Sequence, residues 1–448
     1  MREKTESSAP VVVIGAGMAG ARLAARVPGV TVIGEERHAP YNRVLLAEVL
    51  AGRYAPDVIA LPPAEVRRGV RAVRIDRADR LVHCDDGSVL RYGRLVLATG
   101  SNPVLPPLRG LGTTLPHRAR SLPDSARSLP HGTRSLPHGA PTLPDGVHPF
   151  RTLDDALALR TAVRPGVRAV VIGGGLLGVS AARALAECGA QVVLAQQGEH
   201  LMERQLDPEA AALLRGHLEA LGVEVHTECR VRGLRTTTST STSTSTSTRA
   251  VRAVQLADGY ELAADLTVLA CGVRPRTGLA RAAGLDVRKG IVVDDELRTS
   301  DPYIHAIGDC AEHRSTLYGL AGPALEQADV LVELLAGRPA RYEGTRALTR
   351  LSLRSGRAEG PGGPERPEAL DLAAFGEARP LPGDDVIRLA DATRGAYRTV
   401  VVRDGRLAGG VLLGDLGAVS SLARTWQDDE PLPAAMSLLH LLTDDGGH

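Results

Sequence analysis

The sequence has few cysteines, no long apolar segment and no excess of charge of one sign, and each shortage excludes a class of protein. Its five cysteines are scattered along 448 residues. This spacing excludes a CxxC zinc or redox motif and a clustered iron–sulfur pattern. No apolar run approaches the roughly 20 residues that span a bilayer, and the polar N-terminus lacks the apolar core of a signal peptide. A cytoplasmic protein is therefore expected, with no membrane segment and no metal site.

The charges of the chain nearly cancel. Lys and Arg number 53, Asp and Glu number 52, and the formal net charge is +1. Neither a nucleic-acid partner nor a basic membrane-binding surface is indicated. What is present is a globular composition with 43% apolar residues, and at ~150 residues per domain the length predicts about three domains.

Three low-complexity segments interrupt this globular composition. Residues Thr113–Gly146 repeat a heptad with a leucine and a proline in each repeat. The prolines exclude the coiled coil that a period of seven would suggest, because proline breaks a helix. Residues Thr236–Thr248 are all Thr or Ser, and Ser355–Ala369 is rich in Gly, Pro and charge. All three are expected to be surface insertions, which lengthen loops at small entropic cost.

The rest of the chain contains an internal duplication. Residues Val11–Gly20 resemble Val170–Gly178, and Asp86–Gly100 aligns without a gap to Asp258–Gly272. The spacing between the two matching blocks is longer in the second copy by about the length of the Thr/Ser tract. The tract is therefore expected to lie in a hairpin of the second copy, and two copies of one dinucleotide-binding architecture are predicted.

Each copy begins with a buried strand, a GxGxxG turn and a helix. The first glycine allows the tight turn, the second lets backbone approach a pyrophosphate, and the third lets the helix pack closely on the strand. The helix N-terminus then presents free N–H groups to the phosphates. The predicted phosphate-binding glycines are Gly15, Gly17 and Gly20 in the first copy and Gly173, Gly175 and Gly178 in the second.

The residue that ends the second strand of each copy is expected to meet an adenosine ribose. In the first copy this position is Glu35 or Glu36, and Glu36 is favoured. In the second copy Gln196-Gln197 offers no carboxylate that would reject a 2′-phosphate and no adjacent arginine that would bind one. NADH and NADPH are therefore not separated. Two dinucleotides in one chain suggest FAD and a nicotinamide nucleotide, and hence hydride transfer through the flavin.

The segment Thr299–Asp309 resembles the second FAD motif of the two-dinucleotide-domain flavoprotein reductases. The resemblance implies that Gly308 and Asp309 lie at the ribityl and phosphate region of FAD. Leu97–Gly100 is similar to the family's returning strand beside FAD, which implicates Thr99 and Gly100. Ala270–Pro275 is similar to its counterpart in the nicotinamide-nucleotide domain, which implicates Gly272.

Finer motifs resemble one branch, the NAD(P)H nitrite reductase large subunits, with rubredoxin and ferredoxin reductases as neighbours. Pro40–Leu46 is similar to the segment along the FAD pyrophosphate, where Arg43 would pair with phosphate. Leu201–Asp207 is similarly distinctive. Tyr318–Gln327 implies a helix aimed at the flavin, with Gln327 as a contact. The resemblance covers roughly residues 10–112 and 147–345.

Three departures from this branch stand out. Many relatives carry a lysine near flavin N5 where this chain has Ala47 and Glu48, and a glutamate near the nicotinamide where it has Ser180. These changes bear on the efficiency of hydride transfer rather than on nucleotide binding. Nitrite reductase large subunits also continue into iron–sulfur and sirohaem domains. Without clustered cysteines, these 448 residues are not expected to perform six-electron nitrite reduction alone.

The expected fold class is α/β, with two Rossmann-like dinucleotide-binding domains and a smaller α+β C-terminal domain. The predicted order is the first part of the FAD-binding domain (1–112), the Pro-rich insertion (113–146), the NAD(P)-binding domain (147–275, with the Thr/Ser insertion at 236–248), the second part of the FAD-binding domain (276–340), and a C-terminal interface or dimerisation-like domain (341–448).

The expected function is that of an FAD-dependent NAD(P)H oxidoreductase. Its predicted electron acceptor is a small iron–sulfur protein or the catalytic subunit of an assimilatory nitrite or nitrate reductase. A homodimer is possible, and no catalytic residue is assigned. The alternatives are a rubredoxin or ferredoxin reductase, an NAD(P)H oxidase, and a flavin-bound redox sensor or assembly subunit. No CxxxxC pair supports a dithiol relay, and no GxSxG elbow supports a hydrolase.

Overall fold

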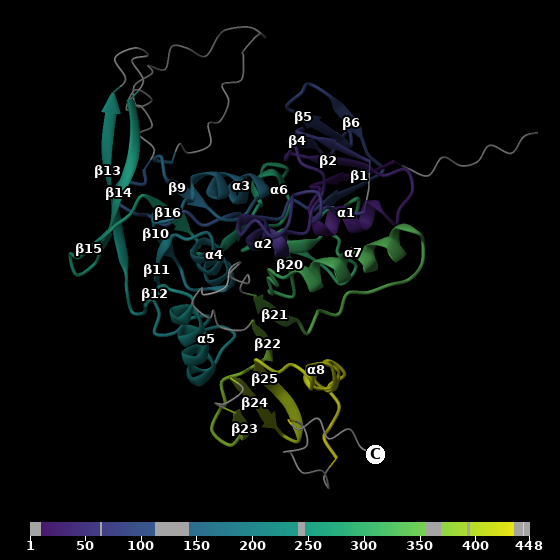
Figure 1. Cartoon of the computed structure of the whole chain (residues 1–448). Helices are drawn as coiled ribbons and strands as arrows, with labels where there is room; N and C mark the ends of the chain where they lie inside the picture. Colours follow the sequence, from purple (N-terminus) through teal and green to yellow (C-terminus); the bar gives the residue numbers. More distant parts are fainter. Residues whose placement is uncertain are drawn as a thin grey trace, which may run out of the picture.

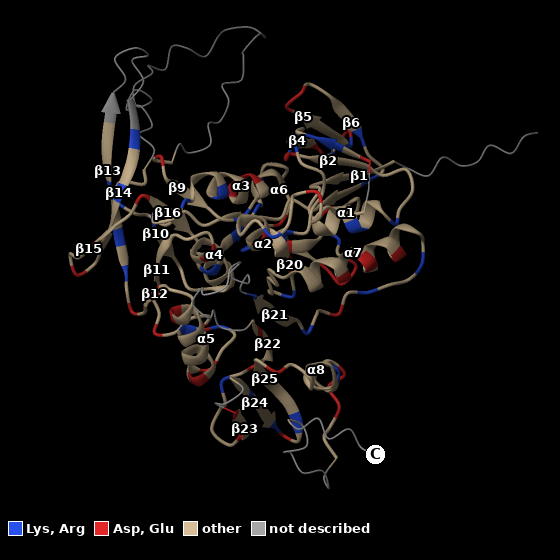
Figure 2. Cartoon of the chain, viewed as in Figure 1, with Lys and Arg blue, Asp and Glu red and all other residues tan. Residues whose placement is uncertain are grey.

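The computed structural model describes residues 10–62, 65–112, 143–240, 247–354, 369–391, 395–433 and 442. Most of the predicted Pro-rich insertion, the middle of the Thr/Ser tract and nearly all of the Gly/Pro-rich segment lie outside the described residues. Basic and acidic side chains are interspersed over the described elements (Figure 2), in keeping with the near-zero net charge. Among the described residues, no helix has the length and apolar character to cross a membrane, and no group of side chains could hold a metal ion.

A five-stranded parallel sheet, which we call the first sheet, has the strand order β19-β7-β1-β2-β3. Figure 1 labels its strands β1 and β2 next to α1. Its central strands are continuous apolar runs, as expected for a parallel sheet covered on both faces. The helices α1 and α7 pack against each other. Arg22 of α1 and Arg26, just after α1, pair with Asp329 of α7 at 2.8 and 2.6 Å. The elements are β1 (Val11–Ile14), α1 (Met18–Ala24), β2 (Thr31–Gly34), β3 (Val66–Arg68), β7 (Arg94–Leu97), β19 (Ile304–Ala306) and α7 (Ala321–Leu335).

A second parallel sheet has the order β9-β16-β10-β11-β12 and repeats the arrangement of the four strands β7-β1-β2-β3. Its edge strand β9 precedes the other four in the chain, whereas β19 follows the other strands of the first sheet. In both sheets the central strand leads through a glycine turn and a helix to the strand beside it. The predicted duplication is therefore confirmed at the level of topology. The elements are β9 (Val147–Pro149), α3 (Leu153–Ala162), β10 (Arg168–Ile172), α4 (Leu176–Glu187), β11 (Gln191–Ala195), α5 (Pro208–Ala220), β12 (Val223–His226) and β16 (Leu266–Leu269).

Each half also carries a three-stranded antiparallel sheet, which the chain forms between β3 and β7 in the first half and between β12 and β16 in the second. In the first half it comprises β4 (Ala72–Asp76), β5 (Leu81–Cys84) and β6 (Val89–Arg91), and in the second half β13 (Val231–Thr240), β14 (Ser247–Leu256) and β15 (Glu261–Ala263). The Thr/Ser tract lies in the β13–β14 hairpin, as predicted. Its ends are strand rather than loop, because the β-ladder continues out to the pair Thr240–Ser247. The β-branched threonines favour this extended conformation.

A two-stranded ribbon joins the two halves. Strand β8 (Ser101–Pro103) leaves the first sheet after β7 and pairs antiparallel with β17 (Val273–Pro275), which follows β16. The chain then returns to the first sheet, where β19 pairs with β7. The remaining elements of this return are α6 (Gly278–Ala282), β18 (Ile291–Val293) and β20 (Ala311–His313).

The C-terminal part is an antiparallel sheet with one helix packed against it, which matches the predicted α+β character. The strand order is β21-β22-β25-β24-β23. The sheet shares an apolar cluster with α2 and α4, and the hydroxyl of Tyr397 donates to Asp207 at the start of α5 at 3.0 Å. The elements are α2 (Leu46–Leu50), β21 (Leu348–Leu353), β22 (Leu370–Gly376), β23 (Asp385–Asp391), β24 (Ala396–Arg403), β25 (Arg406–Leu413) and α8 (Val419–Gln427).

The buried His305 on β19 predicts a loss of stability in mild acid. Burial, together with Arg94 and Arg298, lowers the pKa of His305 from 6.5 to about 4. The folded protein therefore binds fewer protons than the unfolded chain between these values, so the free energy of unfolding falls as the pH drops from about 6.5 to about 4. Urea unfolding at a series of pH values should show a shallower decline for His305→Leu than for the wild type. Identical declines would contradict this assignment.

Candidate nucleotide-binding sites

The first glycine turn joins β1 to α1 and leaves space only at its middle glycine. Gly15 has a φ of +114°, and a Cβ there would lie 2.1 Å from the carbonyl oxygen of Ala98. A Cβ at Gly20 would lie 2.0 Å from the carbonyl oxygen of Gly15. At Gly17 the nearest atom would be Nε of Arg43, 4.0 Å away. The backbone thus requires the outer glycines, while the middle one faces open space where a pyrophosphate can approach.

The second turn, between β10 and α4, repeats this geometry. Gly173 has a φ of +111°, and its Cβ would lie 2.4 Å from the carbonyl oxygen of Ala270. A Cβ at Gly178 would lie 1.8 Å from the carbonyl oxygen of Gly173, whereas nothing lies within 4 Å of that position at Gly175. Gly175 is the N-cap of α4, and no side chain caps this helix. The same division of roles in both turns fits two bound dinucleotides.

Glu36 lies after the end of β2, where two donors hold its carboxylate. Oε2 accepts a hydrogen bond from the hydroxyl of Tyr41 at 2.7 Å, and Oε1 accepts one from Arg43. Burial raises the pKa of Tyr41, so its hydroxyl stays protonated and available as a donor. The neighbouring Glu35 is exposed and pairs with Arg276 at 2.7 Å. Of the two carboxylates, Glu36 is therefore the one turned toward Arg43 and the first glycine turn.

The glycines that follow the equivalent strands β7 and β16 have open backbone. Gly100 has a φ of +69° and Gly272 a φ of +95°, and no atom lies within 4 Å of a Cβ built on either. Beside Gly100, the hydroxyl of Thr99 donates to the carbonyl oxygen of Arg276 at 2.8 Å. The same segment is held by the Arg276 N–H, which donates to the carbonyl oxygen of Gly100 at 2.9 Å.

The Gly308–Asp309 turn follows β19 and is fixed from both sides. The N–H of Gly308 donates to Oε1 of Gln327 at 2.7 Å, and Gln327 is only 1% exposed. Gln327 therefore holds the turn from within the protein. The carboxylate of Asp309 accepts hydrogen bonds from Oγ of Ser101 at 2.9 Å and from Nη2 of Arg151 at 2.5 Å. Asp309 is thus oriented beside Ser101, the first residue of β8.

Sequence reasoning missed Arg151, which connects the predicted FAD residues. The guanidinium of Arg151 binds Asp309, and its backbone carbonyl oxygen accepts a hydrogen bond from Arg43 at 3.1 Å. Its Nε is buried and has no hydrogen-bond partner among the described residues. A guanidinium donor without a protein partner suits an anion such as a pyrophosphate. The capping box of Thr152 and Asp155 fixes the loop, but no local signal pairs Arg151 with Asp309, which is 158 residues away in the chain.

The two side chains that replace those of the relatives, Ser180 and Glu48, both make hydrogen bonds within the protein. The hydroxyl of Ser180 donates to the carbonyl oxygen of Leu176 in the preceding turn of α4, at 2.7 Å. Oε1 of Glu48 accepts a hydrogen bond from Nη2 of Arg183 at 2.5 Å. Gln196 is also turned inward, since its Oε1 accepts from the N–H of Gly174 at 2.8 Å.

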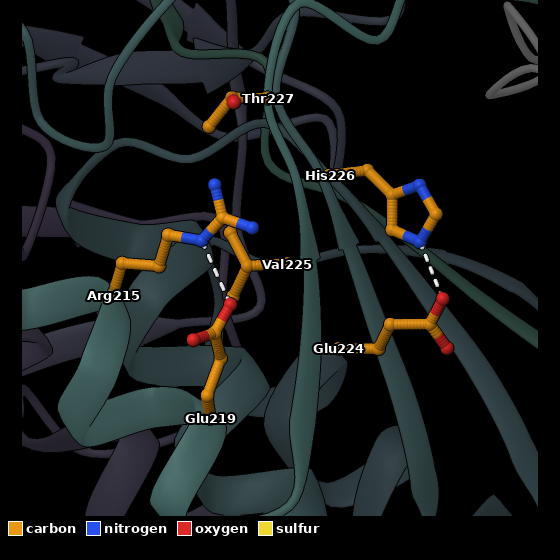
Figure 3. Close-up of a pocket in the computed structure, with 6 residues that line it drawn as sticks. All are labelled: Arg215, Glu219, Glu224, Val225, His226 and Thr227. Carbon is orange, nitrogen blue, oxygen red and sulfur yellow. Dashed lines mark hydrogen bonds and ion pairs between the residues drawn. The ribbon is translucent and has the colours of Figure 1, made fainter. Parts of the chain in front are cut away.

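A surface hollow of about 480 Å³ lies between α5 and the edge strand β12 (Figure 3). Its charged side chains pair with one another, Arg215 with Glu219 at 2.7 Å and His226 with Glu224 at 2.5 Å. The six lining residues include none of the predicted site residues. The hollow offers a ligand no unpaired charge, and we assign no function to it.

Duplicated sheets with matched glycine turns define a protein that holds two dinucleotides. The model of the pyridine nucleotide-disulphide oxidoreductase family matches residues 9–328, and that of the rubredoxin NAD+ reductase C-terminal domain matches residues 369–428. The chain belongs to the pyridine nucleotide-disulphide oxidoreductase family. This membership confirms the predicted fold class, the class of flavoprotein oxidoreductase, and FAD with NAD(P)H as the cofactors.

Two curated relatives and one solved structure illustrate the similarity. The NAD(P)H nitrite reductase large subunit of Klebsiella oxytoca is 34% identical over 90% of this chain and 38% of its own length. The assimilatory nitrate reductase electron transfer subunit of Bacillus subtilis is 31% identical over 90% of this chain and 47% of its own length. The chain thus spans less than half of these two relatives. A ferredoxin reductase from Rhodopseudomonas palustris is 26% identical, with a TM-score of 0.70, over 90% of this chain and 91% of that one.

The contrast between the glycines of the first turn gives a test that separates folding from binding. Gly20→Ala places a Cβ against backbone that cannot move aside, so the free energy of unfolding should fall by about 1–3 kcal/mol. Gly17→Ala has room and an ordinary φ of −73°, so stability should change by less than about 0.5 kcal/mol while FAD affinity drops. Urea unfolding of the apoprotein and FAD titration measure the two effects. Equal destabilisation by both variants would contradict the assigned roles.

Proposed function

We propose that this chain takes electrons from NADH or NADPH through FAD and passes them to a separate redox protein. The observation that carries this proposal is the pair of geometrically matched glycine turns on duplicated sheets, joined by the β8–β17 ribbon. When bound, FAD supplies the chemistry that converts a hydride donor into a source of single electrons. The protein's part is to bind and orient the two nucleotides, and no side chain is required as a general acid or base.

The site residues are assigned to the two nucleotides as follows. FAD is held by the turn Gly15, Gly17 and Gly20, by Glu36, Arg43, Thr99, Gly100, Gly308 and Asp309, and through the turn that Gln327 supports. NAD(P)H is held by Gly173, Gly175, Gly178 and Gly272. To the predicted FAD set we add Arg151, because its buried Nε is free while its Nη2 orients Asp309. The domain limits proposed are those of the sequence analysis, with residues 341–448 as an interface or dimerisation domain.

The acceptor proposed first is the catalytic component of an assimilatory nitrite or nitrate reductase system, in the cytoplasm. The named functions of the two curated relatives support this choice. The second candidate is a rubredoxin or ferredoxin reductase. The match of residues 369–428 to the rubredoxin NAD+ reductase C-terminal domain and the likeness to a ferredoxin reductase over most of both chains favour it. In either case the acceptor is an iron–sulfur protein.

Two substitutions should separate the nucleotide sites. Asp309→Ala removes the carboxylate that Ser101 and Arg151 orient, so the purified protein should contain less flavin. Gly175→Val fills the open face of the second turn, so flavin content should be unchanged while reduction by NADH and NADPH is lost. Absorbance spectra before and after anaerobic addition of each reductant measure both. Full reduction of the Gly175→Val variant at the wild-type rate would contradict the assignment of the second site.

The reductant and acceptor assays distinguish the enzyme from its rivals. Anaerobic mixing of the wild type with NADH or NADPH should bleach the flavin band within seconds. No bleaching over minutes would favour a redox sensor or an assembly subunit instead. The reduced protein is then mixed with a rubredoxin, a ferredoxin, a nitrite reductase catalytic component or oxygen. Fastest reoxidation by oxygen would point to an NAD(P)H oxidase and overturn the proposed electron-transfer role.

A further inference from the structure

A buried network of charges lies where α2, α4 and the start of the C-terminal sheet meet. Glu48 is the single charged residue of the short helix α2, whose other four residues are all apolar and buried. Its Oε1 accepts from Nη2 of Arg183, whose side chain is 1% exposed in the middle of α4. Nη1 of Arg183 also bonds Glu187, one turn further along α4, at 3.1 Å. An ion pair therefore crosses an otherwise apolar helix–helix contact.

The same network extends to the C-terminal sheet. Nη2 of Arg53, just after α2, bonds Glu187 at 2.6 Å, and its Nε lies 3.3 Å from Oε2 of Glu48. Arg53 and Arg183 both donate to the carbonyl oxygen of Arg354, the residue that follows β21. Two carboxylates and two guanidinium groups are thus shared among three parts of the chain. Burial raises the pKa of Glu48, and Arg53 and Arg354 oppose this rise.

The two helices that this network joins each begin at a proposed nucleotide site. The 3-10 turn Arg43–Leu45 runs directly into α2, so Arg43 and Glu48 belong to one continuous helical segment. Helix α4 starts at Gly175, and Arg183 lies about two turns further on. The Glu48–Arg183 pair therefore cross-links two rigid segments close to where each meets its dinucleotide.

Stability alone is a poor explanation for such a pair. Burying two charges costs about as much as their attraction returns, and well-packed apolar side chains of similar size often serve stability equally well. What an ion pair adds is direction, because a guanidinium and a carboxylate bind in a narrow range of geometries. A directional contact suits a place where the relative position of two sites matters, since a misplacement of about 1 Å can slow a reaction about a hundredfold.

We infer that the Glu48–Arg183 pair is a positioning clamp, which fixes the NAD(P)H site relative to the FAD site. Its kinetic consequence rests on the proposed function. Arg183 and Glu48 are positioning residues and need not touch either nucleotide. With the clamp in place the two sites keep one separation, and without it the units joined by the β8–β17 ribbon move against each other.

The test compares single and double replacements. Arg183→Met removes the guanidinium donors that bond Glu48 and Glu187 and leaves both carboxylates with Arg53 alone in this network, so this variant should lower the thermal unfolding midpoint. The double variant Glu48→Leu/Arg183→Met removes one charge of each sign and leaves the Arg53–Glu187 pair intact, so its midpoint should return to the wild-type value. Flavin reduction by NADH in the holoprotein should nevertheless stay about tenfold to a hundredfold slower in the double variant, as in the single one.

A second measurement is independent of activity. Amide hydrogen exchange in the β8–β17 ribbon of the holoprotein should be faster in both variants than in the wild type, because this ribbon would carry the motion that the clamp restrains. Arg183→Lys keeps the charge but loses the paired donors, so it should restore stability and only part of the rate. Arg215→Ala is the matched control. It breaks the exposed Arg215–Glu219 pair on α5, which has the same four-residue spacing as Arg183 and Glu187 on α4, and it should change none of these readouts.

The outcomes separate this inference from the proposed function. If the double variant recovers stability, the wild-type rate and wild-type exchange together, the pair is only structural and the clamp is refuted. If the double variant does not fold, the comparison of Arg183→Lys with the wild type decides, and equal rates and exchange refute the clamp. If the wild type itself is not reduced by NADH or NADPH, the proposed function fails, and hydrogen exchange still tests the clamp.

Discussion

The structure depends on a contact between backbone atoms that no side chain allows. In both halves the first glycine of the turn lies against the carbonyl group of the residue just after the neighbouring strand, Ala98 after β7 and Ala270 after β16. The third glycine lies against the first, and this closeness lets the following helix pack directly on the sheet. The middle glycine, in contrast, has open space where its side chain would be, so its backbone is accessible to a pyrophosphate. The strands, the ribbon and the returning segment are then arranged around two such turns.

Much of the fold could be predicted because the sequence repeats itself. The two glycine turns and the matching blocks at Asp86–Gly100 and Asp258–Gly272 reappear as one arrangement of four parallel strands found twice, with a three-stranded sheet in each half. The location of the Thr/Ser tract in a hairpin was also predicted, from spacing alone. That its ends form regular strand was not predicted, because a tract without apolar alternation gives no burial pattern from which to infer one.

The candidate site was predictable only in part. Glycines reveal their roles locally, since each role depends on nearby backbone. Arg151 was missed because its partners Arg43 and Asp309 come from distant parts of the chain. The sequence identified Glu48 only as a residue that stands where many relatives have a lysine. No pattern indicated its partner Arg183, which lies among the apolar residues of α4. The sequence also predicted Gln327 as a contact to the flavin, and the structure shows that it accepts a hydrogen bond from the Gly308 N–H, which no short pattern indicated. Which residues of distant segments meet is decided by tertiary packing, which short patterns do not record.

The hairpin β13–β14 also has a practical consequence. Thr240 and Ser247 are directly opposed in the ladder, so the two strand ends are already held together whatever peptide joins them. The same hairpin forms single β-bridges to Arg109, through Gly233 of β13, and to Asp145, through Ala250 of β14. Arg109 precedes the proline-containing repeats, and Asp145 lies at their C-terminal end. One corner of the molecule therefore accepts extra chain at two neighbouring points with little penalty for closing a loop. A reporter peptide or affinity handle grafted between Thr240 and Ser247 would leave the glycine turns untouched.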